Sequence, residues 1–303
     1  MKSLINTLAL VVVLFTFVSC GETKKKKEEA TENTQEKVSE NEVKSNPLND
    51  VYWGDTHLHT DLSLDAGAMG NRIGMDEAYR FAMGEEVTSS SGLKAKLSRP
   101  LDFLVIADHS DGMGIFPQLF AGEGSIMSTP EGKRWGKLLG EGKDVEAFND
   151  ILTNFSQGTL SFKTNDENIM RPVWEKVVKA AEKYNNPGKF TAFIGYEWTS
   201  FISGNNLHRV VIYRDNGDKT KGHLPYTKED SEDPEDLWKN MAMYEKNTGG
   251  QVLAIPHNGN LSNGIMFAET RINGESVDET YAKERFKREP LYEVTQIKGD
   301  GEA

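Results

Sequence analysis

The chain has 303 residues, of which 37% are hydrophobic and 27% charged, and it contains one cysteine. This composition suffices for one large or two smaller domains, and it excludes a disulfide framework and a cysteine-rich zinc module. The net charge of −12 argues against a nonspecific grip on nucleic-acid phosphates, so no nucleic acid is expected as a partner. A small anionic substrate is still compatible with this charge, because bound metal ions can reverse the field inside a cleft.

The N-terminal segment resembles the signal of a bacterial lipoprotein. A mostly apolar run from Leu4 to Val18 follows Lys2 and is shorter than the roughly 20 residues of a membrane span. The run ends at Ser19 and Cys20, and in lipoproteins such a cysteine is acylated and becomes the mature N-terminus. The resemblance therefore implies a signal peptide over 1–20, lipidation at Cys20 and an exported protein anchored to a membrane of the cell envelope. An ordinary cleaved signal with an incidental cysteine is the alternative.

Residues 21–50 are predicted to form a disordered, charged tether. They consist mainly of Lys, Glu, Thr, Ser and Asn and contain almost no apolar side chain. Four consecutive lysines, Lys24 to Lys27, could contact anionic lipid headgroups or could simply improve solubility. The folded domain is expected over 51–303.

From residue 51 onward, short β-like runs alternate with helical patterns. Strands are predicted over 51–59, 101–107, 190–197, 208–213, 251–256 and 291–298, and helices over 75–83, 145–155, 171–184, 234–246 and 278–287. Several of the strands are nearly continuous apolar runs, which is typical of parallel strands buried on both faces. The alternation predicts an α/β barrel or a doubly wound sheet, with 84–100 and 110–144 as insertions.

Histidines are concentrated where the predicted strands begin or end. His57 and His59 are two residues apart, so they point to the same side of a strand and could form a pair of metal ligands. His257 directly follows a predicted strand, His109 lies just beyond the end of another, and His208 is the first residue of a third. Carboxyl ends of strands are where barrels and open sheets place their chemistry. A single histidine at such a position more often caps or hydrogen-bonds than binds a metal, but the pattern as a whole predicts a metal site. The sixth histidine, at position 223, is predicted to be a surface residue.

Six segments resemble the PHP superfamily, named for its polymerase and histidinol phosphatase members, in a bacterial branch catalogued as a domain of unknown function. They are YWGDTHLHTDLSLDAG (52–67), EAYRFAMGEEVTSS with LSRPLDFLVIADHSDGMG (77–114), IGYEWTS (194–200), NNLHRVVIYRD (205–215), AIPHNGN (254–260) and EVTQIKG (293–299). The resemblance implies a distorted, TIM-like (β/α)7 barrel with up to three metal ions at its carboxyl end. Imidazole and carboxylate ligands suit Zn, Mn or Fe.

The resemblance also implies roles for individual side chains. Glu197 would bridge two of the ions, and Asp108 would orient a ligand through a hydrogen bond. Independently of the resemblance, Asn258 directly follows His257 and could hydrogen-bond a ligand or substrate, or could serve the turn alone. The implied metal ligands are His57, His59, Asp65, His109, Glu197, His208 and His257.

Three cationic residues near these motifs are candidates to contact an anionic substrate, namely Arg72, Arg209 and Lys298. Surface charges or structural ion pairs are the equally weighted alternative for all three.

The sequence departs from the PHP pattern near its end. The family closes its site with an Asp-x-His motif, and none follows Glu293. The chain is therefore expected to be a C-terminally truncated fragment whose barrel lacks its last segment and which could be inactive.

The resemblance favours an exported metal-dependent hydrolase, with phosphoester hydrolysis as the default chemistry. Amide or ester hydrolysis by the same ligand set is one alternative. A non-catalytic lipoprotein that binds a metal or another ligand is the second.

Overall fold

The computed structural model describes residues 49–301. The predicted signal peptide, the lipidation site at Cys20 and nearly all of the predicted tether lie outside the described residues. Within 49–301, no helix combines the length and the apolar character needed to cross a bilayer.

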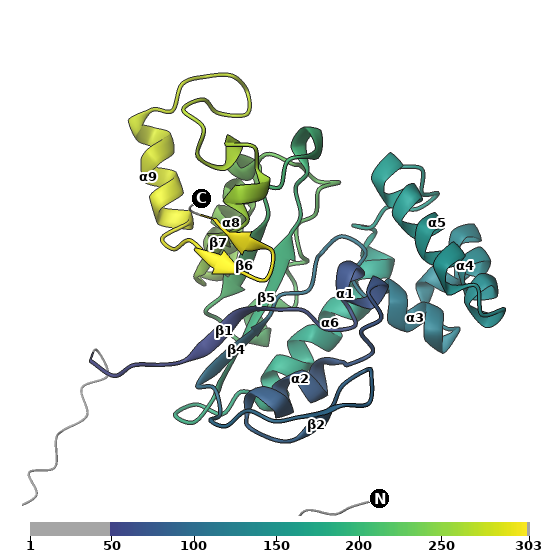
Figure 1. The fold of residues 1–303 in the computed structure, drawn as a ribbon. Helices are drawn as coiled ribbons and strands as arrows, with labels where there is room; N and C mark the ends of the chain where they lie inside the picture. The colour runs from purple at the N-terminus through teal and green to yellow at the C-terminus, as the bar shows by residue number, and fades with distance from the viewer. Residues whose placement is uncertain (1–48, 302–303) are drawn as a thin grey trace, which may run out of the picture. The chain divides into compact units, whose positions relative to one another are not determined.

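A curled, half-barrel sheet of five strands forms the centre of the domain, in the order β1-β4-β5-β6-β7 (Figure 1). The strands are β1 (Gly54–Leu58), β4 (Phe103–Ile106), β5 (Thr191–Trp198), β6 (Arg209–Tyr213) and β7 (Val252–Pro256). Strands β1, β4 and β5 are parallel neighbours, whereas β6 is antiparallel to both β5 and β7. Five of the six predicted strands are therefore confirmed as members of one sheet.

The sheet is mixed, so the expectation of parallel strands is wrong for β6, and a TIM-like barrel is not confirmed. Residues 199–208 connect β5 to β6. A parallel neighbour needs a crossover of a dozen or more residues, usually including a helix, whereas an antiparallel neighbour can follow a short loop. The length of this connection thus accounts for the reversal of direction.

The predicted strand over 291–298 is also wrong as a member of the main sheet. Only β8 (Thr295–Gln296) forms there, and it pairs antiparallel with β9 (Gly299–Asp300) in a separate two-stranded ladder. Gly299 has a φ of +117°, which glycine adopts without steric cost, so the chain can turn back on itself at this point. The segment keeps one backbone hydrogen bond to the end of β7, from the Glu293 N–H to the carbonyl oxygen of Pro256, and otherwise pairs locally.

Helices cover the sheet and provide most of the core. The main ones are α2 (Met75–Ala82), α6 (Glu167–Tyr184), α8 (Pro234–Thr248) and α9 (Glu279–Arg288), which confirm four predicted helices. Helix α6 begins at Asp166, whose side chain accepts a hydrogen bond from the amide of Asn168. Its buried face, with Trp174 and Val177, packs against β5.

A second, smaller core lies in the segment interpreted as an insertion. Helices α3 (Ile115–Ala121), α4 (Pro130–Gly140) and α5 (Asp144–Gln157) bury Trp135 and Ile151 between them. Helix α5 confirms the predicted helix over 145–155. The remaining elements are α1 (Leu64–Ala68), α7 (Gly217–Thr220), the β2 (Val87–Thr88) and β3 (Lys94–Ala95) hairpin, and four 3₁₀ turns at Ser125–Ser128, Ile202–Gly204, Gly259–Leu261 and Ile265–Phe267.

Candidate metal centre

The predicted ligands meet at one edge of the sheet. His57 lies in β1, Glu197 lies near the end of β5, and His257 directly follows β7. Because β6 runs in the opposite direction, its start lies at the same edge as the ends of β5 and β7, and this places His208 beside them. His109 follows β4 and forms an isolated parallel bridge with Glu197. All five strands of the sheet therefore contribute to one cluster.

The Glu197 carboxylate is the centre of this cluster. Its side chain is 0% exposed, and five imidazole nitrogens lie within 3.5 Å of its two oxygens. On Oε1 these are His208 Nδ1 at 2.7 Å and His257 Nε2 at 2.8 Å; on Oε2 they are His59 Nε2 at 2.7 Å, His57 Nε2 at 3.1 Å and His109 Nδ1 at 3.5 Å.

Asp65 extends the cluster toward solvent. Its Oδ1 lies 3.0 Å from His59 Nδ1, and its Oδ2 lies 3.5 Å from His109 Nε2. The Ser63 hydroxyl donates a hydrogen bond of 2.6 Å to Oδ1 and so fixes the carboxylate. With 34% of its side chain exposed, Asp65 is the most accessible of the predicted ligands.

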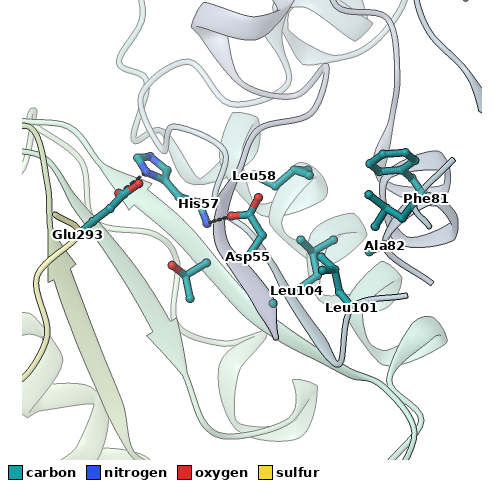
Figure 2. A pocket seen from close by; sticks show the side chains of 11 residues that line it. Asp55, His57, Leu58, Phe81, Ala82, Leu101, Leu104 and Glu293 are labelled. Atoms are coloured by element: carbon teal, nitrogen blue, oxygen red, sulfur yellow. Dashed lines mark hydrogen bonds and ion pairs between the residues drawn. The ribbon is translucent and has the colours of Figure 1, made fainter. Parts of the chain in front are cut away.

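Glu293 is a member of the cluster that was not predicted. Its Oε2 lies 2.7 Å from His57 Nδ1 and 3.9 Å from His257 Nδ1. Figure 2 shows Glu293 and His57 facing each other beside β1, at one end of a cavity of about 410 Å³. Its signal in the sequence was weak, a single carboxylate within the apolar alternation of a predicted strand that the structure does not form.

The environment of the histidines shifts their pKa values in opposite directions. Burial lowers the pKa of His57 and His59, but the neighbouring carboxylates outweigh it: Glu197 and Glu293 raise the pKa of His57 to about 9, and Asp65 and Glu197 raise that of His59 to about 10. Burial dominates for His208 and lowers its pKa to about 3. The surrounding imidazoles outweigh burial at Glu197 and hold its pKa well below the usual range.

The imidazole nitrogens of the cluster lie where they could bind cations, and they are not all satisfied by hydrogen bonds. Within the described part of the chain, His59 Nε2, His208 Nε2 and His257 Nδ1 are buried without a hydrogen-bond partner, and His59 Nε2 is so despite its short distance to Glu197. A buried unpaired polar group costs about 1–3 kcal/mol, and a nitrogen lone pair directed at a metal ion removes that cost. Among the residues that the structure describes, four groups of side chains could hold an ion: His57–His257–Glu293, His57–His59–Glu197, His59–Asp65–His109 and His109–Glu197–His208.

A comparison with known protein families assigns the region that holds this cluster to one family. A family model described as a protein of unknown function (DUF3604) matches residues 46–303. The chain belongs to the DUF3604 family. No curated protein and no solved structure is significantly similar to it. The expected domain of unknown function is thus confirmed, whereas membership of the PHP superfamily stays a prediction.

Two polar residues of the DUF3604 domain that were predicted to orient ligands are buried beside the cluster. The Asp108 carboxylate accepts hydrogen bonds from the amide and hydroxyl of Thr60, at 2.5 and 2.7 Å, and so joins β4 to the turn after β1. Burial raises the pKa of Asp108 to about 6. Asn258 has a left-handed φ of 60°, and neither atom of its side-chain amide has a hydrogen-bond partner among the described residues.

The three cations predicted to contact substrate have other surroundings in the DUF3604 domain. Arg72 donates to the carbonyl oxygens of Gly67 and Asn71, and its guanidinium lies over the ring of Phe120. Arg209 is 2% exposed and pairs with a buried glutamate, as the structural alternative expects. Lys298 is exposed in the turn between β8 and β9, where its carbonyl oxygen accepts from Asn260.

Proposed function

We propose that this protein is a metal-dependent hydrolase of the PHP type that acts on phosphoesters. The observation that supports this best is the convergence of five imidazoles on the buried Glu197 carboxylate. A structural role alone would not require so many histidines around one charge, since buried polar groups are normally satisfied by hydrogen bonds.

The ligand set fits two or three ions of Zn, Mn or Fe, because imidazole and carboxylate donors are mixed in every group. Glu197 has both oxygens surrounded by imidazoles, so it is the residue able to bridge two ions. Ions held there would lower the pKa of a bound water toward neutrality and offset the charge of a phosphoryl group.

The chain's own side chains define how a substrate would meet this centre. Asp65 and Glu293 are the exposed carboxylates of the cluster, at 34% and 20%, so substrate approaches a negative rim. Arg72 and Arg209 are engaged elsewhere. Capture of a phosphate is therefore expected to depend on the ions rather than on an arginine clamp. On the inner side, the Thr199 hydroxyl lies 2.7 Å from His109 Nδ1 and can fix the orientation of that ring.

The test begins with metal content, measured by mass spectrometry on the purified protein. We expect two or more equivalents in the parent and the loss of at least one in Glu197→Gln. His223→Ala is the matched control, since this histidine bonds to Asn240 away from the cluster, and it should match the parent. A folded parent without metal after reconstitution would refute the proposal.

The second step compares substrates. Phosphomonoesters and phosphodiesters are tested beside amides and carboxylic esters, with Zn²⁺, Mn²⁺ or Fe²⁺ and with a chelator. We expect turnover of phosphoesters that the chelator abolishes. Turnover of amides or esters alone would favour the other hydrolase chemistry, and tight metal binding without turnover would favour a binding lipoprotein.

Export and membrane anchoring are part of the same proposal. Incorporation of a labelled fatty acid into the protein in a bacterial host, and its loss in Cys20→Ser, is the expected result. Labelling that persists in the variant would contradict lipidation at this residue.

A further inference from the structure

A buried ion pair lies behind the cluster without touching a predicted ligand. Arg209 Nε lies 2.9 Å from Glu289 Oε1, and the two side chains are 2% and 1% exposed. The same carboxylate accepts hydrogen bonds from Trp238 Nε1 at 2.8 Å and from Arg285 Nε at 3.2 Å. Desolvation makes a buried ion pair a poor source of stability, but three donors fix the position of Glu289 tightly.

The short segment 289–293 connects this ion pair to Glu293, and the segment is held in place at both of its ends. Glu289 directly follows α9, and four residues later Glu293 donates its backbone N–H to the carbonyl oxygen of Pro256 at 3.1 Å. Pro256 is the register partner of Arg209 across β6 and β7. The contacts therefore form a closed loop from Arg209 through Glu289 and Glu293 to Pro256 and back to Arg209.

Two predicted metal ligands are adjacent in the sequence to residues of this closed circuit of contacts. His208 precedes Arg209, and the Arg209 guanidinium also donates to the carbonyl oxygen of Leu207. His257 follows Pro256 and shares the group with His57 and Glu293. In Figure 2 the Glu293 side chain reaches His57 from a different segment of the chain than β1. Its position thus depends on what holds that segment.

We propose that the Arg209–Glu289 ion pair is a positioning device for Glu293 and thereby sets the affinity of the His57–His257–Glu293 group for a metal ion. The inference rests on the proposed metal centre. It assigns Arg209 a role in building the site in place of the predicted contact with substrate, and it makes the end of α9 part of that site.

The test measures zinc stoichiometry and affinity, by competition with a chromophoric chelator, in the full-length protein. Glu293→Gln removes the ligand, and Glu289→Ala removes only its support. We expect both variants to lose the same single equivalent. Glu289→Gln keeps the acceptor for Trp238 but weakens the ion pair, so it should retain that equivalent with affinity lowered about 10- to 100-fold, as for other residues that orient ligands.

The double variant Glu289→Ala/Glu293→Gln distinguishes positioning from general damage. If Glu289 acts through Glu293, the double variant loses no more than either single variant, because the two changes affect one interaction. The matched control is Glu245→Gln, which weakens the 2.7 Å pair with the buried Arg288 in the same way and so also loosens α9 from α8. This control should keep every equivalent.

The outcomes distinguish the proposed metal-dependent function from the positioning role of the Arg209–Glu289 ion pair. A parent that binds no zinc overturns the proposed function and this inference with it. A parent that binds several ions, with Glu289→Ala unchanged in stoichiometry and affinity, overturns the inference alone. Loss of a further equivalent in the double variant, or equal loss in Glu245→Gln, also overturns it. If Glu289→Ala does not fold, Glu289→Gln decides by the same criterion.

Discussion

The metal-free protein should lose stability as the pH rises from 7.5 to 9. In the absence of ions, both ring nitrogens of His57 and of His59 face carboxylates, so the folded state favours two imidazolium rings. Their pKa values are raised from 6.5 to about 9 and about 10. Their contribution to stability is complete below pH 6.5 and is lost as the pH rises through these folded-state values.

The magnitude follows from the number of protons that each state binds. At pH 7.5 to 8 the unfolded chain holds almost no proton on these two rings, whereas the folded chain holds nearly two. At pH 9 the folded chain holds about 1.4, because a pKa of about 9 leaves His57 half protonated. Each proton contributes about 1.4 kcal/mol per pH unit, so the free energy of unfolding should fall by about 2–2.5 kcal/mol per unit. Burial lowers the pKa values of His208 and His257, so both are neutral in this window whether folded or unfolded.

Urea unfolding in the presence of a chelator, at several pH values across this window, measures the slope. Glu197→Gln removes one of the two carboxylates that face each ring, so its slope should be shallower. Saturating zinc should abolish or reverse the decline, because metal binding requires neutral imidazole. A free energy of unfolding that is constant across the window in the metal-free parent would refute the assignment of charge to these two histidines.

Three further predictions concern single residues. Arg72→Ala should change KM by less than about twofold and stability by about 1 kcal/mol, since it loses the contact with Phe120 and the exposed hydrogen bonds to the carbonyl oxygens of Gly67 and Asn71; a large rise in KM would restore the substrate role. Thr60→Val should lower the free energy of unfolding by about 1–3 kcal/mol in urea titrations, because it leaves a buried oxygen of Asp108 without its donor. Gly195→Ala should cost about 1–3 kcal/mol by thermal unfolding, since its new Cβ would lie 2.6 Å from a side chain of β4, and an unchanged midpoint would contradict this crowding.

Much of the fold and most of the cluster could be predicted because the signals are local. The helical spacing of Val173, Val177 and Ala181 marks one buried face, and the structure buries all three against the sheet. In the sequence, the end of a strand can be recognised as the point where an apolar run stops at a polar residue. The ligands at these points, such as His109 and His257, therefore converge once the strands pair.

What could not be predicted depends on pairing between distant segments. The direction of β6 follows from the loop before it, and an apolar run of Val and Ile reads the same in either direction. Glu293 enters the cluster only because the segment after α9 is held at Pro256 and Glu289. The partner of Arg209 is 80 residues away, so no local spacing distinguishes a buried pair from a substrate contact.

The sequence separations of the cluster residues bear on the order in which they can meet during folding, and for Glu197 the hairpin of β5 and β6 has the shortest. Glu197 and His208 are 11 residues apart and meet across one turn, whereas His57 reaches Glu197 over 140 residues and Glu293 over 236. Hairpins close in about 1–10 μs, and contacts between distant segments must first overcome a larger loop entropy. During folding, the carboxylate and its first imidazole can therefore be in place before β1 arrives with His57.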